Sequence, residues 1–266
     1  MTELAALRVL DSFSDRGDGP VNEDVFQYGQ SAAWVVDGAT ALTEPFRIEG
    51  MTSPRWLAEV LSQFLANYEP NVHSWEQLGR ARLHSAAAQG LNSVHRDTWR
   101  QWPSASLGFA VASAERLIVD CIGDVEVVLL LRTGRYASLR VADSRSPLVS
   151  YSKVTGAAAL IKQRNEVLGE ESAWTISRMP PHEAAWARWE GSREDVCRAL
   201  LFSDGFGRIR RYYGSVPIHS ILQGRLAIQD AVKDLRIAEA SQKGDHSEKT
   251  HDDATAVLIS LEAGCV

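Results

Sequence analysis

The chain has 266 residues, of which 45% are hydrophobic and 23% are charged. These proportions are typical of a soluble globular domain, and they exclude a disordered, collagen-like or coiled-coil chain. The formal net charge is −6, which argues against nucleic acid or an anionic membrane surface as a partner. The sequence has no apolar run of about 20 residues and no signal-peptide pattern at its start, so we expect a cytoplasmic protein.

The first hundred residues predict two strands followed by two helices. Strands are expected at 25–29 and 31–37, because these β-rich runs are bounded by turn residues. Apolar residues recur at helical spacing over 53–67, where Pro54 suits a helix start. A second helix, rich in alanine and arginine, is expected at about 75–99.

The middle of the chain predicts an antiparallel meander of four strands, at 106–113, 116–124, 125–134 and 135–141. The pattern then loosens, apart from a short helix near 157–164. The last third predicts a strand, two helices and a final strand, at 198–203, 217–222, 226–239 and 254–262. Because strands and helices are grouped rather than alternating, we expect an α+β fold in a single domain spanning 1–266.

Several of the predicted strands carry an acidic residue at one end. These residues are Glu23, Asp24, Asp37, Asp124, Asp204, Asp252 and Asp253. Each one alone is ordinary turn chemistry. If the strand ends share an edge, however, the carboxylates converge and repel one another, and a hard divalent cation would relieve that repulsion. An all-oxygen set of ligands suits Mg²⁺ or Mn²⁺ better than zinc.

The order of the motifs NED, DGAT, GD, SDGF and DDAT resembles the metal-dependent serine/threonine protein phosphatases of the PPM (type 2C) family, bacterial type. The resemblance covers about 9–261. It implies a four-layer α-β-β-α sandwich of two antiparallel sheets flanked by helices, with a variable flap at about 143–195. It also implies two metal ions between the sheets, a phosphorylated protein as substrate and a cognate serine/threonine kinase.

The resemblance assigns the central ligands residue by residue. Asp37 matches the acid that bridges both ions, and the carbonyl of Gly38 matches a ligand of one of them. Asp204 and Asp252 match the ligands of the other ion. Together with Asp24, the carboxylates of Asp37 and Asp204 are the predicted catalytic groups.

Three further acidic positions have a place in the resemblance. Glu23 and Asp24 match the pair that holds metal-bound water, directly or through intervening contacts. Asp124 matches an acid that helps to hold a looser third ion. Asp253 stands where many relatives have asparagine, and we interpret it as a neighbour of the site rather than a ligand.

Two positions depart from the family pattern. Members typically carry an arginine five residues before the NED aspartate, which grips the substrate phosphate through two hydrogen bonds. This chain has Gly19 at that position, so Arg16, in a shortened loop, is the candidate for the phosphate contact. Ala39 stands where eukaryotic members have a histidine that serves as a proton donor.

The function that we expect is hydrolysis of phosphoserine and phosphothreonine in proteins, through a water activated by two metal ions. The missing arginine leaves two alternatives open. One is a pseudophosphatase or regulatory binding module on the same fold. The other is a phosphatase that acts on small phosphorylated molecules.

Overall fold

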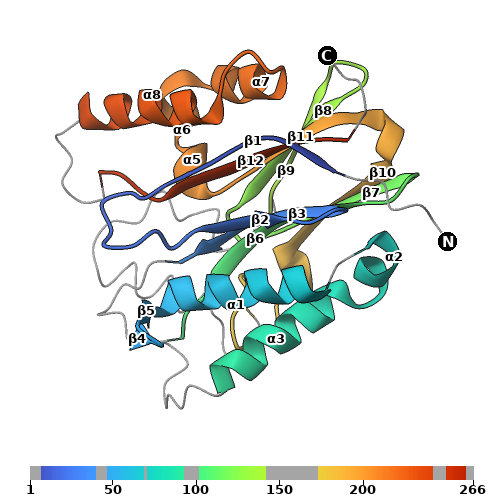
Figure 1. Ribbon diagram of the computed structural model, residues 1–266, viewed down its shortest axis with the longest axis vertical. Coiled ribbons are helices and arrows are strands. Elements are labelled where there is room, and N and C mark those ends of the chain that lie inside the picture. Colours follow the sequence, from blue (N-terminus) through green and yellow to red (C-terminus); the bar gives the residue numbers. More distant parts are fainter. Residues whose placement is uncertain are drawn as a thin grey trace.

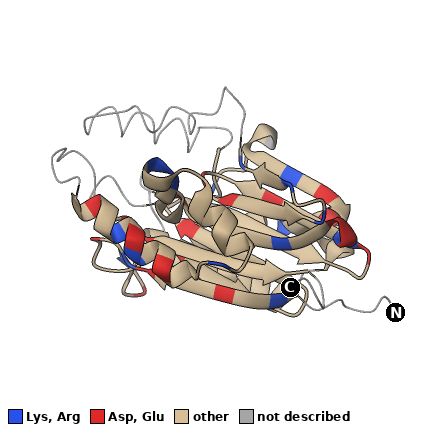
Figure 2. Cartoon of the chain, turned by 90° about the horizontal axis from the view of Figure 1, so that it is seen from above, with Lys and Arg blue, Asp and Glu red and all other residues tan. Residues whose placement is uncertain are grey.

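The computed structural model describes residues 7–39, 47–68, 71–92, 102–141, 173–241 and 250–261. The helix predicted near 157–164 lies outside these residues, as does the predicted continuation of the second helix beyond Asn92. No helix in the described part of the chain is long and apolar enough to cross a membrane. Acidic and basic positions are interspersed along the described elements (Figure 2).

The strands form two five-stranded antiparallel sheets and one small hairpin. The first sheet has the order β1 (Arg8–Asp15), β12 (Ala254–Ser260), β11 (Val196–Phe202), β8 (Glu126–Leu131) and β9 (Tyr136–Leu139). The second has the order β10 (Trp186–Ser192), β7 (Arg116–Ile122), β6 (Ala105–Ala112), β3 (Ala32–Gly38) and β2 (Val25–Tyr28). The hairpin pairs β4 (Arg47–Ile48) with β5 (Met51–Thr52).

The helices fall into an N-terminal and a C-terminal group. The first group is α1 (Ser53–Tyr68), α2 (Val72–Ser74), the π-helical turn η1 (Trp75–Gly79) and α3 (Arg80–Asn92). The second group is α5 (Asp204–Gly207), α6 (Ile209–Tyr213), α7 (Val216–Leu222) and α8 (Ile228–Ser241). Two single 3₁₀ turns, η4 (Glu183–Ala185) and η5 (Arg193–Asp195), precede and follow β10.

The predicted four-layer α-β-β-α sandwich is confirmed. Helices α1 and α3 cover the outer face of the second sheet, and α6, α7 and α8 cover the outer face of the first (Figure 1). Three apolar cores fill the spaces between the four layers. Fully burying one large apolar side chain stabilises the fold by about 1.5–3 kcal/mol, so these cores fix the positions of the strands and of their ends.

Strand β3 shows how the sequence sets the two faces of a buried strand. Trp34 and Val36 point toward the helices, and Ala33 and Val35 point toward the other sheet. This division follows from the two-residue period of a strand. Continuing the period, Asp37 at the end of the strand lies on the face between the sheets.

One strand of the second sheet is missing from the predicted pattern. Strand β10 pairs with β7 along its whole length, from Trp186 opposite Ile122 to Ser192 opposite Arg116. The loosely patterned segment expected at about 143–193 therefore contains a regular strand at 186–192. The alternation is hard to see because the outer face of β10 carries charged residues that are satisfied by ion pairs rather than by apolar contacts.

The second predicted helix also begins earlier than expected. Asn71 caps it, with its side chain accepting a hydrogen bond from the amide of Ser74, and the helix starts at Val72. A π-helical turn from Trp75 to Gly79 then separates the first turn from α3. The turn directs the Trp75 ring into the core, where it stacks on Phe109 at 3.9 Å between ring centroids.

Candidate active site

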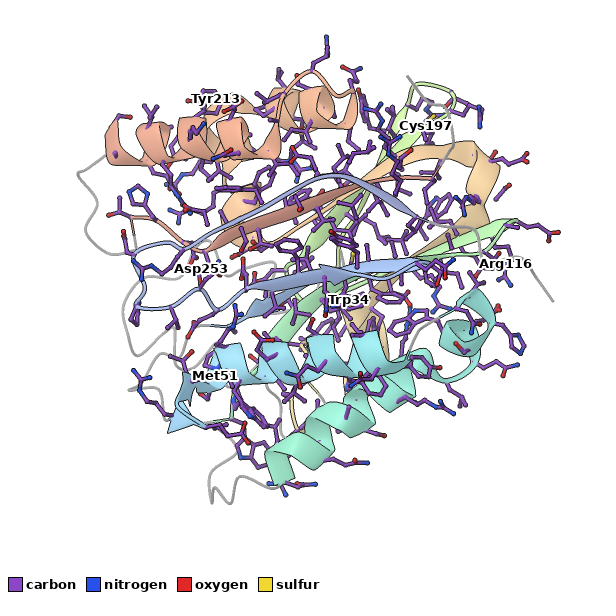
Figure 3. All side chains as sticks on the ribbon, in the orientation of Figure 1. Trp34, Met51, Arg116, Cys197, Tyr213 and Asp253 are labelled. Atoms are coloured by element: carbon purple, nitrogen blue, oxygen red, sulfur yellow. The ribbon has the colours of Figure 1, made fainter. Side chains whose placement is uncertain are left out.

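The predicted acidic residues gather at one end of the sandwich. In the second sheet, β3 ends and β2 begins at the same edge, because Val25 pairs with Val36. In the first sheet, β11 ends where β12 begins, because Phe202 pairs with Ala256. Figure 3 shows Asp253 at this end, between the two sheets. The antiparallel pairing thus brings the acidic motifs to one edge from segments far apart in sequence.

Asp37 and Asp204 approach each other across the gap between the two sheets. The backbone amide of Asp204 lies 3.4 Å from Oδ2 of Asp37. Asp37 is the last residue but one of β3 in the second sheet, and Asp204 follows β11 of the first. This contact joins the DGAT and SDGF motifs directly.

Asp37 is surrounded by the other carboxylates of the group. Burial raises the pKa of its carboxyl well above the ordinary value, and repulsion from Asp24, Asp204, Asp124 and Asp252 raises it further. The four neighbours come from both sheets. Asp37 therefore lies close enough to all four of these carboxylates to be repelled by each of them.

Asp204 is exposed, although protein atoms that include the other carboxylates lie around its carboxyl. Loss of hydration raises the pKa of its carboxyl well above the usual range, and repulsion from Asp124 and Asp252 adds to the effect. The following residue, Gly205, lies directly against the backbone of Asp253, where a Cβ atom would collide with the carbonyl oxygen. The glycine of the SDG motif therefore lets the Asp204 turn pack against the start of β12.

Asp24 lies deep between the sheets. Burial raises the pKa of its carboxyl to about 7, although hydrogen bonds from the side chains of Ser203 and Thr255 lower it in part, and repulsion from Asp253 and Asp252 raises it. Its Oδ2 atom is buried and has no hydrogen-bond partner. A buried carboxylate oxygen without a partner is costly, so this atom is positioned to meet a cation or a water molecule.

Asp124 follows β7 in a tight turn. Gly123 has a φ of 81°, a backbone conformation that glycine adopts readily. The hydroxyl of Ser106 donates a hydrogen bond of 2.6 Å to Oδ1 of Asp124. Desolvation raises the pKa of the Asp124 carboxyl, the Ser106 hydrogen bond opposes that shift, and repulsion from Asp252 supports it. The side chain is thus oriented by Ser106 and belongs to the same electrostatic group.

Asp253 holds the NED loop in place. Its Oδ1 accepts a hydrogen bond from the amide of Gly17 at 2.8 Å, and its Oδ2 accepts one from the amide of Glu23 at 2.6 Å. Glu23 itself is buried. Because both carboxylate oxygens bind backbone amides, these contacts agree with the interpretation of Asp253 as a neighbour of the site.

The arginines next to the NED loop bind backbone carbonyls. Arg16 is exposed, and its Nη1 donates to the carbonyl of Pro20 at 3.0 Å, within its own loop. Arg55, on α1, donates to the carbonyls of Asn22 at 3.0 Å and Asp24 at 2.6 Å. Gly38 packs closely against the carbonyls of Glu23 and Pro54. In this structure Arg16 therefore stabilises its loop instead of extending toward the carboxylates.

The oxygen donors of the acidic residues are of the type that binds a hard divalent cation, but they are not arranged around a common point. Among the described residues, no group of three or more His, Cys, Asp or Glu side chains is arranged so that it could hold a metal ion. The carboxylates nevertheless raise one another's pKa, and the partnerless Oδ2 of Asp24 is an unfilled acceptor. Oxygen donors that repel one another suit Mg²⁺ or Mn²⁺.

Several residues around the site could not be assigned from the sequence. Ser106, Ser203 and Thr255 contact the acidic residues through their hydroxyls. In addition, Glu239 of α8 is buried and pairs with residues next to two of the acidic motifs. The sequence does indicate that Glu239 is buried, because it follows Leu235 by four positions and therefore lies on the same face of α8.

No model of a known protein family matches the sequence, and no curated protein matches it. Solved structures do match. A bacterial serine phosphatase aligns with a TM-score of 0.62 and 14% identity, over 97% of this chain and 100% of that one. The catalytic domain of the serine threonine protein phosphatase PstP, in complex with two manganese ions, aligns with a TM-score of 0.58 and 19% identity, over 96% and 98%. The serine/threonine phosphatase Stp1 from Staphylococcus aureus aligns with a TM-score of 0.57 and 15% identity, over 99% and 96%. The chain therefore has the fold of these bacterial phosphatases.

Proposed function

We propose that this protein is a metal-dependent phosphomonoester hydrolase of the PPM (type 2C) family that dephosphorylates phosphoserine and phosphothreonine in proteins. The observation that carries the proposal is the approach of Asp37 and Asp204 across the two sheets, with Asp24, Asp124 and Asp252 in electrostatic contact. The fold shared with PstP, whose structure contains two manganese ions, supports it.

The residues proposed to hold two Mn²⁺ or Mg²⁺ ions are Asp37, the carbonyl of Gly38, Asp204 and Asp252, with Glu23 and Asp24 holding water beside them. Asp124 would help to hold a third ion. When bound, such ions supply Lewis-acid chemistry that acidifies water and neutralises charge on phosphoryl oxygens.

The chain's own residues position the acceptors around which this chemistry would take place. Asp24 offers its partnerless Oδ2 as a buried acceptor. Ser203 and Thr255 orient the Asp24 carboxylate, and Ser106 orients Asp124. No cysteine or serine nucleophile is needed, because water is the attacking group in the proposed reaction.

The test measures phosphate release by the metal-free protein before and after addition of Mn²⁺. Substrates are a phosphothreonine peptide, a phosphoserine peptide and a small aryl phosphate. We expect Mn²⁺-dependent release from the peptides, and its absence from the Asp37→Asn variant. Release from none of the three substrates would overturn the proposal and favour a binding module on the same fold.

A second candidate function is hydrolysis of small phosphorylated molecules. It is favoured by Arg16, which binds its own loop in place of a substrate phosphate. A kcat/KM for the aryl phosphate that exceeds those for both peptides would support this candidate. A preference for the peptides would instead support a protein substrate phosphorylated by a serine/threonine kinase.

A further inference from the structure

A buried carboxylate on the C-terminal helix lies between two of the acidic motifs. Glu239 is on the face of α8 that also carries Leu235, and its side chain is only 1% exposed. A charge in such a place is costly unless it is paired. Its partners are Arg208, Arg236 and His251, and we refer to these four residues as the Glu239 network.

One arm of the network leads to Asp204. Nε of Arg208 forms an ion pair with Oε1 of Glu239 at 3.2 Å. The backbone amide of Arg208 donates to the carbonyl of Asp204 at 3.0 Å, one helical turn earlier. The position of the SDG turn is therefore tied to Glu239 through a single residue.

The other arm leads to Asp252. Nδ1 of His251 lies 2.8 Å from Oε2 of Glu239. Arg236 donates to the same oxygen at 2.9 Å, and its Nη2 donates to the carbonyl of Asp252 at 2.7 Å. The remaining Nε of Arg236 binds Asp15 at the end of β1 at 2.9 Å. Arg236 thus holds Asp252 between α8 and β1.

Stability alone is a weak reason for such a network, because buried ion pairs can often be replaced by apolar residues without loss. Its arrangement gives it another use. Asp204 begins α5 after β11 and Asp252 precedes β12, and they are the two carboxylates proposed as ligands of the same ion. The Glu239 network contacts the backbone of both segments: Arg208 binds the carbonyl of Asp204, and Arg236 binds the carbonyl of Asp252.

We propose that Glu239 is a positioning residue for the metal site. By holding Arg208 on one side and His251 and Arg236 on the other, it fixes the separation of the carboxylates of Asp204 and Asp252. The inference rests on the proposed function in so far as those carboxylates bind an ion. Residues that orient metal ligands typically contribute about 10- to 100-fold to metal affinity.

The main variant is Glu239→Gln, which keeps the length of the side chain but removes its charge. We expect the metal-free variant to bind Mn²⁺ about 10- to 100-fold more weakly than the wild type in calorimetric titration. Hydrogen exchange should also become faster at the amides of 204–208 and 250–253. The matched control is Asp120→Asn, which breaks a buried ion network on the outer face of the second sheet. It should leave Mn²⁺ affinity unchanged, and any faster exchange that follows from lower global stability should not be concentrated at 204–208 and 250–253.

Arg236→Lys is the second variant, measured in place of the first if Glu239→Gln does not fold. Lysine keeps the charge but cannot reach Asp15, Glu239 and the carbonyl of Asp252 together, so Mn²⁺ affinity should again fall. Wild-type affinity in a folded variant would overturn the inference, and so would an equal loss in Asp120→Asn. If the wild type binds no Mn²⁺, the proposed function fails. Unchanged exchange at 204–208 and 250–253 in the variant would then overturn the positioning role independently.

Discussion

The backbone amide of Asp204 lies 3.4 Å from the carboxylate of Asp37, although Asp37 is in the second sheet, Asp204 follows a strand of the first, and the two are 167 positions apart. Strand β3 of one sheet and strand β11 of the other end at this contact. Asp37 and Asp204 are each repelled by the other carboxylates. Removing the charge of either residue therefore lowers the repulsion felt by the rest of the group.

Asp37→Asn and Asp204→Asn should each abolish phosphate release while leaving the protein folded. Each substitution removes one negative charge from a group of mutually repelling carboxylates, so the free energy of unfolding of the metal-free protein should hold or rise. Affinity for Mn²⁺ should fall. Activity assays, urea unfolding and calorimetry measure the three effects. The control is Asp230→Asn, at an exposed ion pair of α8, and near-wild-type turnover in either site variant would defeat the assignment.

The metal-free protein should become less stable as the pH rises from about 5 to 8. The pKa of Asp24 is raised to about 7, and those of Asp37 and Asp204 are raised well above their usual values. The folded state therefore binds more protons than the unfolded state between about pH 4 and 7, and its stability is lost as these groups ionise. Urea unfolding at pH 5 and pH 8 checks this. Equal or greater stability at pH 8 in the absence of metal would contradict it, whereas added Mn²⁺ should raise stability at pH 8.

Arg16→Ala should change kcat/KM by no more than about twofold, because exposed charges are screened at ordinary ionic strength and Arg16 binds the carbonyl of Pro20. A phosphate contact would instead cost about ten- to a hundredfold, since hydrogen bonds to charged groups contribute about 1.5–3 kcal/mol. Steady-state kinetics with a phosphothreonine peptide distinguish the two results. Arg116→Ala, at the opposite end of the sandwich (Figure 3), is the matched control.

Asp124→Ala should lower turnover substantially while two tightly bound ions remain. Asp124 interacts with Asp37 and Asp204 through space, and Ser106 holds its side chain. Ser106→Ala should have the same effect in weaker form, because it frees the carboxylate without removing it. Calorimetry gives the number of tight ions, and kinetics as a function of Mn²⁺ concentration reveals a weaker one. Loss of both tight ions, or no kinetic effect, would rule out this role.

Asp120→Asn should lower the free energy of unfolding at pH 7 by about 3 kcal/mol, since it breaks a buried ion network. Asp120 is fully buried and binds Arg80, Arg188 and the indole of Trp75. The two arginines hold the pKa of the Asp120 carboxyl below its usual value despite burial. Its contribution is therefore complete above about pH 4 and is lost as the pH falls further. Urea unfolding of both proteins at pH 7 and pH 3 should show the difference shrinking at pH 3.

The grouping of strands and helices predicted an α+β fold, and the resemblance of the acidic motifs to a known family predicted its four layers. Helix α1 has a clear period of 3.6 because it buries one face, whereas strand β3 reads as a continuous apolar run because it buries both faces. Strand β10 has no such pattern, because Arg188 and Glu190 on its outer face are neutralised by partners from other elements. Ion pairs of this kind depend on tertiary structure and leave no local period.

The gathering of the acidic residues could be predicted from the sequence as well. Each acidic residue stands beside a strand, and their order along the chain indicated that they belong together. The residues that hold them were not predictable, because their partners are remote. Asp253 binds the amide of Gly17, 236 positions away, and no local pattern relates the two.

Strand β12 has a consequence for the order in which the protein folds during synthesis. It lies between β1 and β11 in its sheet, although it is the last of the described strands to leave the ribosome. Until it emerges, β1 and β11 have no common neighbour, and the amides of Gly17 and Glu23 lack their acceptor on Asp253. The acidic group therefore assembles only after β12 has been synthesised, and the nascent chain has no complete site before that point.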